Sequence, residues 1–86
     1  MVKGDYIKPH PDTKTTNYHD VRNIAKALII DKHDGTITVR ILEGSAYDKQ
    51  RGYTRHASGS RREFIAYDIH KWVPYDSEEI DKYEIW

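Results

Sequence analysis

A strict alternation of aliphatic and polar residues is the feature of this sequence that most restricts its fold. In residues 36–41 every second residue is Ile or Val, which places the aliphatic side chains on one face of a half-buried strand. The apolar run 24–30 comes shortly before, and Asp34 and Gly35 supply the positive φ of a tight turn between the two segments. The sequence therefore predicts a β-hairpin over residues 24–43.

Two more strands are predicted after the hairpin. Residues 64–69 alternate again, with Ile65, Tyr67 and Ile69 forming one of the two sets. Residues 69–71 fit a single tight turn, and the last short strand, 72–73, precedes a proline that interrupts regular pairing.

A short edge strand is predicted over residues 4–8. The prolines at positions 9 and 11 close it, because neither can donate a ladder hydrogen bond. Residues 9–23 then form a long loop, and residues 44–62 form a second long loop that is rich in Gly, Ser, Tyr and Arg and lacks periodicity.

The chain has 86 residues, which is enough for one domain only. We expect residues 1–75 to form that domain and residues 76–86 to form an acidic tail. The tail begins with a capping residue followed by acids, which predicts a short C-terminal helical turn. The predicted fold class is therefore all-β, with two long loops and this terminal turn.

Four runs of the sequence carry a resemblance to a known class of fold. These runs are residues 3–8, 24–31, 36–44 and 64–73. They resemble small SH3-like barrel proteins, including phage- and prophage-type members without a characterised function. The resemblance implies an SH3-like barrel of about five strands that acts as a binding module. Similar barrels bind peptides, nucleic acids or modified lysines, so the resemblance names no single ligand.

Charge is balanced overall but divided unevenly along the chain. With 14 basic and 14 acidic residues, the total charge excludes a polybasic protein and an acidic DNA mimic. Residues 49–62 hold five basic and no acidic side chains, whereas residues 63–86 hold two basic and seven acidic ones. The two segments either pair with each other across the fold or stay solvated.

The basic segment 49–62 is a candidate nucleic-acid site. Its five cations could neutralise phosphates while Tyr53, helped by Tyr47, stacks on a base. Five cations on a neutral protein would bind only weakly at physiological ionic strength. The alternative is a solvated loop in which Arg61 and Arg62 pair with the acidic tail.

Aromatic and arginine side chains in the expected loops and tail favour protein binding over nucleic-acid binding. Such residues dominate the energetics of protein interfaces, whereas Tyr6, Tyr67 and Trp72 are expected in the core or at its rim. The sequence thus predicts a non-catalytic protein-binding module, and the resemblance implies a phage-type accessory protein that docks on a host protein. The candidate partner-binding residues are Tyr47, Arg51, Tyr53, Arg55, Arg61, Arg62, Tyr83 and Trp86.

Other classes of function find little support in the sequence. The serines lie in turn or capping contexts, so we expect no enzyme. The five histidines show no close ligand spacing, although His10 and His19 could converge with Asp12 and Asp20 on a metal. We expect no metal and no cofactor. No apolar run reaches the roughly 18 residues of a membrane span, so we expect no membrane association and a cytoplasmic location.

Overall fold

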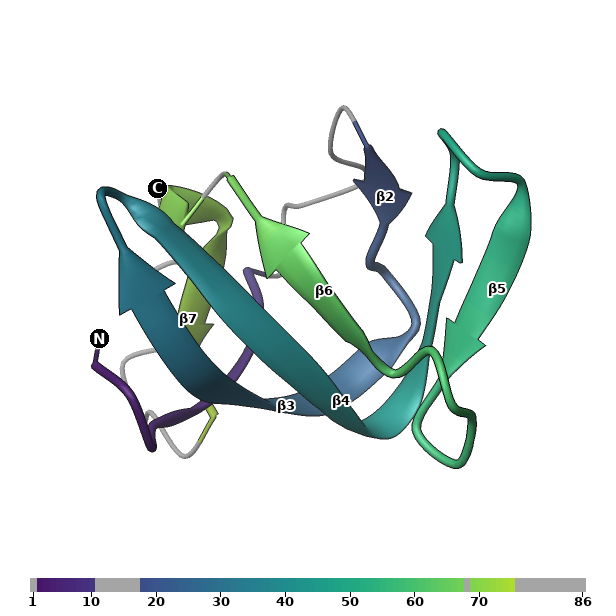
Figure 1. The fold of residues 1–86 in the computed structure, drawn as a ribbon. Coiled ribbons are helices and arrows are strands. Elements are labelled where there is room, and N and C mark those ends of the chain that lie inside the picture. The colour runs from purple at the N-terminus through teal and green to yellow at the C-terminus, as the bar shows by residue number, and fades with distance from the viewer. Residues whose placement is uncertain (1, 11–17, 68, 76–86) are drawn as a thin grey trace.

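Seven antiparallel strands form one strongly curled sheet in the computed structural model, which describes residues 2–10, 18–67 and 69–75 (Figure 1). The strands are β1 (Tyr6–Pro9), β2 (His19–Asp20), β3 (Ile24–His33), β4 (Thr36–Asp48), β5 (Tyr53–His56), β6 (Glu63–Ala66) and β7 (Trp72–Pro74). A single 3-10 turn, η1 (Ile69–Lys71), joins the last two strands and confirms the predicted tight turn. The all-β fold class is confirmed. No helix of the described part is long and apolar enough to span a membrane.

The hairpin predicted from the alternating pattern is formed by β3 and β4. Its turn contains Asp34 at φ 45° and Gly35 at φ 82°, the positive values that such a turn requires. The hydroxyl of Thr36 closes the turn by donating a hydrogen bond to the carbonyl of His33 at 2.7 Å. Strand β4 extends beyond the predicted hairpin to Asp48, so it is the longest strand of the sheet.

Strand β4 bends and thereby serves both limbs of the half-barrel. Its first half pairs with β3 and β6, and its second half pairs with β2 and β5. Gly44 lies at the junction with φ 95°, opposite Ile24 in β3. In Figure 1 the two limbs curve toward each other, with β6 on one limb and β2 on the other, and the ladder is not closed between these two strands.

The core lies inside this curl and follows the alternation of the sequence. Ile37, Val39 and Ile41 of β4 are completely buried, as are Ile7 of β1 and Ile29 of β3. Burying each such side chain stabilises the fold by about 1.5–3 kcal/mol relative to exposing it. The aliphatic face of the hairpin is therefore the main source of stability.

The long loop predicted over residues 44–62 is wrong. Residues up to Asp48 continue β4, and β5 returns alongside them, with Asp48 opposite Tyr53 and Ala46 opposite Arg55. The inward-facing positions of this hairpin include Asp48 and Arg55, both buried. Strands are recognised in a sequence by aliphatic residues at every second position. A strand whose inward positions hold a buried charged pair lacks this pattern, which explains the error.

The edge position predicted for the first strand is also wrong. Strand β1 lies between β3 and β7. Hydrogen bonds at both ends of β1 hold it to β7: the amide of His10 donates to the carbonyl of Lys71 at 2.8 Å, and the amide of Tyr75 donates to the carbonyl of Tyr6 at 2.9 Å. A proline at the end of a strand is thus tolerated inside a sheet.

Two other sequence predictions concern segments that the structure describes incompletely. Within the predicted loop 9–23, residues 19–20 form β2, which pairs with the end of β4. Residues 11–17 lie outside the described residues, and so does the predicted helical turn over 76–86.

The bend at Gly44 generates a stability prediction. A Cβ atom at this position would collide with the backbone carbonyl oxygen of Asn23, in addition to the strain of a positive φ. We expect Gly44→Ala to lower the free energy of unfolding by more than about 2 kcal/mol. Gly52→Ala is the matched control, because Gly52 has φ 77° but open space around it, and it should cost only about 1 kcal/mol. Urea denaturation measures both values, and equal losses would contradict the proposed clash.

Candidate binding groove between β2 and β6

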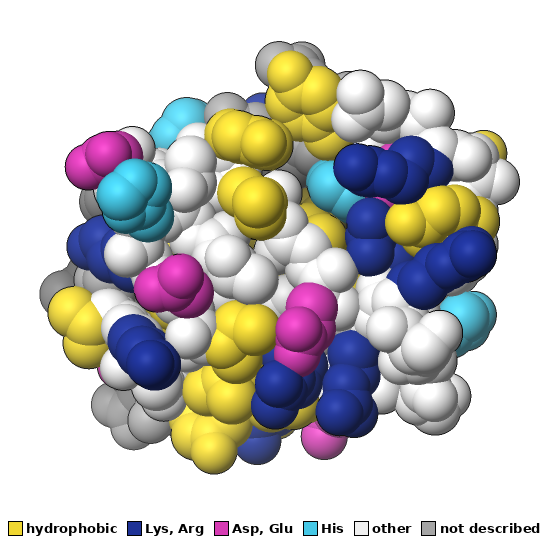
Figure 2. Space-filling model, in the orientation of Figure 1, with side chains coloured by type: hydrophobic (Ala, Val, Ile, Leu, Met, Phe, Trp, Pro, Cys, Tyr) yellow, Lys and Arg dark blue, Asp and Glu magenta, His cyan; other side chains and the backbone are white. Residues whose placement is uncertain are grey.

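A groove of about 490 Å³ lies between β2 and β6 and extends onto the β4–β5 hairpin. Tyr18 and His19 line one side, Phe64, Ile65 and Tyr67 line the other, and Arg51 lies at the hairpin end. In Figure 2 hydrophobic, histidine and cationic side chains gather over this part of the molecule, at the upper right. We call this feature the β2–β6 groove.

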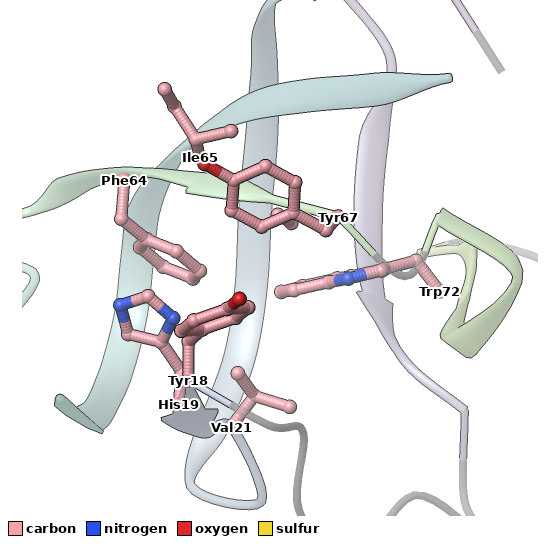
Figure 3. Close-up of a pocket in the computed structure, with 8 residues that line it drawn as sticks. Tyr18, His19, Val21, Phe64, Ile65, Tyr67 and Trp72 are labelled. Carbon is pink, nitrogen blue, oxygen red and sulfur yellow. The ribbon is translucent and has the colours of Figure 1, made fainter. Parts of the chain in front are cut away.

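Two tyrosines form an aromatic surface at one end of the β2–β6 groove. The ring centroids of Tyr18 and Tyr67 are 5.4 Å apart, and the two residues are 42 % and 57 % exposed (Figure 3). Ile65 of β6, two residues before Tyr67, is 48 % exposed. The cavity beneath the rings is only about 10 Å³, which leaves room for no more than one water. A ligand would therefore lie on the rings and not beneath them.

A buried carboxylate organises the opposite, hairpin end of the groove. Asp48 is completely buried, and its Oδ1 accepts a hydrogen bond from the backbone amide of Arg51 at 2.9 Å. Its Oδ2 accepts from Nη2 of Arg55 at 2.9 Å and from Nη1 of Arg51 at 3.3 Å. Burial alone would raise the pKa of Asp48, but these hydrogen bonds outweigh it and lower the pKa from 3.8 to about 2. The carboxylate is therefore ionised at neutral pH.

Arg55 connects this carboxylate to the rest of the sheet. The residue is 7 % exposed, and its Nη1 donates to the carbonyl oxygens of Arg61 and Glu63, both at 2.9 Å. Its Nη2 also donates to the Tyr53 hydroxyl at 3.1 Å. Arg55 thus holds the start of β6 against the β4–β5 hairpin.

His19 lies between the charged and aromatic ends of the groove. Its ring centroid is 4.4 Å from that of Phe64, and its Nε2 is 3.5 Å from Oδ2 of Asp48. Burial lowers the pKa of His19 below 6.5, even though the nearby Asp48 carboxylate acts in the opposite direction. In the described part of the chain, the two guanidiniums of Arg51 and Arg55 share the one carboxylate of Asp48, so this end of the groove is positively charged.

The structure brings some of the sequence-predicted site residues together, since Arg55 donates hydrogen bonds to Tyr53 and Arg61, but it does not place them all in the groove. Of those that the structure describes, Arg51 and Arg55 line the β2–β6 groove, and Arg55 is buried. Tyr47 is 47 % exposed but does not line the groove. The ring of half-buried Tyr53 is covered by Arg61, whose guanidinium carbon is 4.1 Å from the ring centroid. Arg62 is exposed, whereas Tyr83 and Trp86 lie outside the described residues, as does any contact of Arg61 or Arg62 with the acidic tail.

Sequence reasoning missed the aromatic end of the groove because it placed the wrong side chains of β6 inside. Phe64 and Ala66 are buried, whereas Ile65 and Tyr67 are exposed, so of the two places expected for Tyr67, the core and its rim, the core is excluded. Both alternating sets of residues in this segment are apolar, so the pattern does not show which set faces the core. Assigning the wrong set to the core exchanges the buried and the exposed face. Tyr6 is likewise 51 % exposed and lies outside the core, while Trp72 is buried in it.

The histidine and aspartate residues considered for a metal do not form a metal site in the described residues. No group of three potential ligands converges there. The Asp20 carboxylate instead accepts hydrogen bonds from Nε and Nη2 of Arg22, at 2.9 and 2.5 Å. Asp12 lies outside the described residues.

Comparisons with known proteins identified no relative of this chain. No protein-family model, no curated protein and no solved structure matches the chain.

The Asp48 cluster generates a second stability prediction. Asp48→Asn removes the charge that balances two neighbouring guanidiniums and leaves Arg55 buried without its counter-ion. Losing one member of a buried ion pair typically costs about 3–5 kcal/mol, and we expect a loss in this range. Asp20→Asn is the control, because Asp20 forms a more exposed pair with Arg22, and it should cost about 1 kcal/mol or less. Chemical denaturation at pH 7 measures both, and a similar small loss for both variants would show that the cluster contributes little.

The lowered pKa of Asp48 also predicts how stability changes with pH. The carboxylate is favoured in the folded state, so its contribution is complete above about pH 4, the ordinary range of an unfolded Asp. The contribution is lost as the pH falls through the folded pKa of about 2. Unfolding free energies between pH 5 and pH 2 should therefore fall more steeply for the wild type than for Asp48→Asn. Parallel curves would contradict the assigned pKa.

Proposed function

We propose that this protein is a non-catalytic module that binds a segment of another protein in the β2–β6 groove. The observation that carries the proposal is the exposed pair Tyr18 and Tyr67, with Ile65 beside it and a cationic end nearby. Aromatic residues expose much apolar area at low entropic cost, and together with arginine they are the usual anchors of protein interfaces. An uncovered apolar patch beside charged residues is typical of a binding surface.

The chemistry of the groove favours binding over catalysis. Asp48 accepts hydrogen bonds on both oxygens and has a pKa of about 2, which makes it a poor general base. His19 is buried and directed at this same carboxylate. The two groups stabilise the groove and are not positioned to transfer a proton to a ligand.

Nucleic-acid binding by residues 49–62 ranks second. One face of the Tyr53 ring is covered by the guanidinium of Arg61 and is therefore closed to a stacking base. Arg55 is buried and directed at Asp48, so it is not available to a phosphate. Both observations favour a protein ligand over a nucleic acid.

The proposal also includes what the resemblance implies, namely an SH3-like barrel and a phage-type protein. The bent strand β4, shared by two limbs of a half-barrel, is compatible with an SH3-like barrel. On this assignment the protein is a phage-type accessory protein in the cytoplasm, and its ligand is a segment of a host protein.

Selection of peptides from a random display library tests the proposal. We expect enriched peptides whose affinity falls about 30-fold or more in the double variant Tyr18→Ala and Tyr67→Ala, the loss typical of interface hot spots. Tyr47→Ala is the matched control and should bind normally, since Tyr47 is similarly exposed but lies outside the groove. Failure to enrich any peptide, or equal binding by the double variant, would contradict the proposal. Tighter, salt-sensitive binding to a single-stranded oligonucleotide would favour the second hypothesis.

A further inference from the structure

The direction of the backbone groups in β6 can be derived from one hydrogen bond. The amide of Ile41 in β4 donates to the carbonyl of Arg62, just before β6, at 2.9 Å. In an antiparallel pair, hydrogen-bonded and non-hydrogen-bonded residue pairs alternate. Because Val39 pairs with Phe64 and Thr38 with Ile65, the amide and carbonyl of Phe64 point toward β4 and those of Ile65 point away from it.

The outer edge of β6 is therefore open beside the β2–β6 groove. Among the described residues, no other strand pairs with β6 on this side. At its start, the outward carbonyl of Glu63 accepts a hydrogen bond from Arg55. Ile65, two residues further along β6, is the next residue whose backbone points outward. Its backbone has no hydrogen-bond partner in the described residues.

This open edge is short but lacks several of the other features that protect an edge strand from pairing with another strand. Natural edge strands are commonly guarded by proline, by unpaired charges or by a bulge. The sequence of β6 is Glu-Phe-Ile-Ala, and its one charge is neutralised by Arg40, whose Nε lies 2.7 Å from the Glu63 carboxylate. The edge is thus suited to accept an added strand.

We infer that the ligand of the groove is an extended, acidic segment of another protein, which adds as a strand to the outer edge of β6. This inference rests on the proposed function and specifies how the groove recognises its partner. The added strand would exchange backbone hydrogen bonds with Ile65 and lie in the gap toward β2. Alternate side chains of the segment would then contact the rings of Tyr18 and Tyr67.

Charge complementarity selects an acidic occupant. Among the described residues, the Arg51 and Arg55 guanidiniums of the groove are paired with a single carboxylate, that of Asp48. The Arg51 side chain is 56 % exposed, and its one side-chain hydrogen bond among the described residues, from Nη1 to Asp48, is long at 3.3 Å. Its remaining donors can bind a ligand carboxylate with two parallel hydrogen bonds. A second copy of this chain would instead bring two positive grooves together.

Hydrogen exchange distinguishes strand addition from simple contact with the tyrosines. The probe is the tightest peptide from the display selection, bound to the full chain. We expect the Ile65 amide to exchange rapidly in the free protein and about tenfold or more slowly in the complex. The Ala66 amide, which points toward β4, is the internal control and should be protected in both states. Methylating the peptide backbone nitrogens one at a time should weaken binding at every second position.

The acidic requirement is tested with charge variants. Arg51→Gln should weaken the binding of an acidic peptide about tenfold or more, since hydrogen bonds to charged groups are among the strongest. Arg22→Gln is the matched control, because Arg22 is similarly exposed and paired with Asp20, away from the groove. Enriched peptides without acidic residues, or equal losses in both variants, would overturn the acidic assignment.

Failure of this inference can be told apart from failure of the proposed function. Binding that depends on Tyr18 and Tyr67 without protection of Ile65 would overturn strand addition and leave the binding module in place. Enrichment of no peptide would instead contradict the module itself. Peptide binding that is seen only after removal of residues 76–86 would indicate that this acidic segment is the occupant of the groove. A concentration-dependent dimer in sedimentation, lost in the double tyrosine variant, would make a second copy the occupant. Either of these two results would overturn the inference.

Discussion

The buried ion pair of Asp48 and Arg55 is the interaction on which the second limb of the half-barrel depends. This limb contains few aliphatic residues, so side-chain hydrogen bonds replace apolar packing as its link to the core. Arg55 joins Asp48 at the end of β4 to the carbonyls of Arg61 and Glu63 at the start of β6. One guanidinium thereby connects three strands. Such a pair is costly to desolvate but costs still more to break, because the remaining charge would be buried alone.

The same pair shapes the candidate binding surface. By directing Arg55 inward, Asp48 leaves Arg51 as the exposed cation of the groove, and it also faces His19, which burial keeps neutral. The positive end and the aromatic end of the β2–β6 groove therefore have fixed positions relative to each other. A ligand would meet a preorganised surface, which reduces the entropic cost of binding.

The sequence predicted the elements with a simple apolar period and missed those without one. The hairpin of residues 24–43 and the turn at 69–71 were confirmed because aliphatic alternation and turn chemistry are local signals. The hairpin of β4 and β5 was predicted as a loop, since its inward positions hold Asp48 and Arg55. The candidate site was only partly predicted: Arg51 lines the groove, but the tyrosines that form its aromatic end were not selected.

Local sequence alone determined the all-β class, the β3–β4 hairpin and the aliphatic core, because side-chain alternation and positive-φ turns depend on near neighbours. Tertiary structure decided which face of β6 is buried, since both of its alternating sets are apolar and only packing against Trp72 and His19 selects Phe64. It also decided which of the arginines is buried. That choice depends on the distance to Asp48 across the paired strands, and strand pairing brings together residues that no local pattern relates.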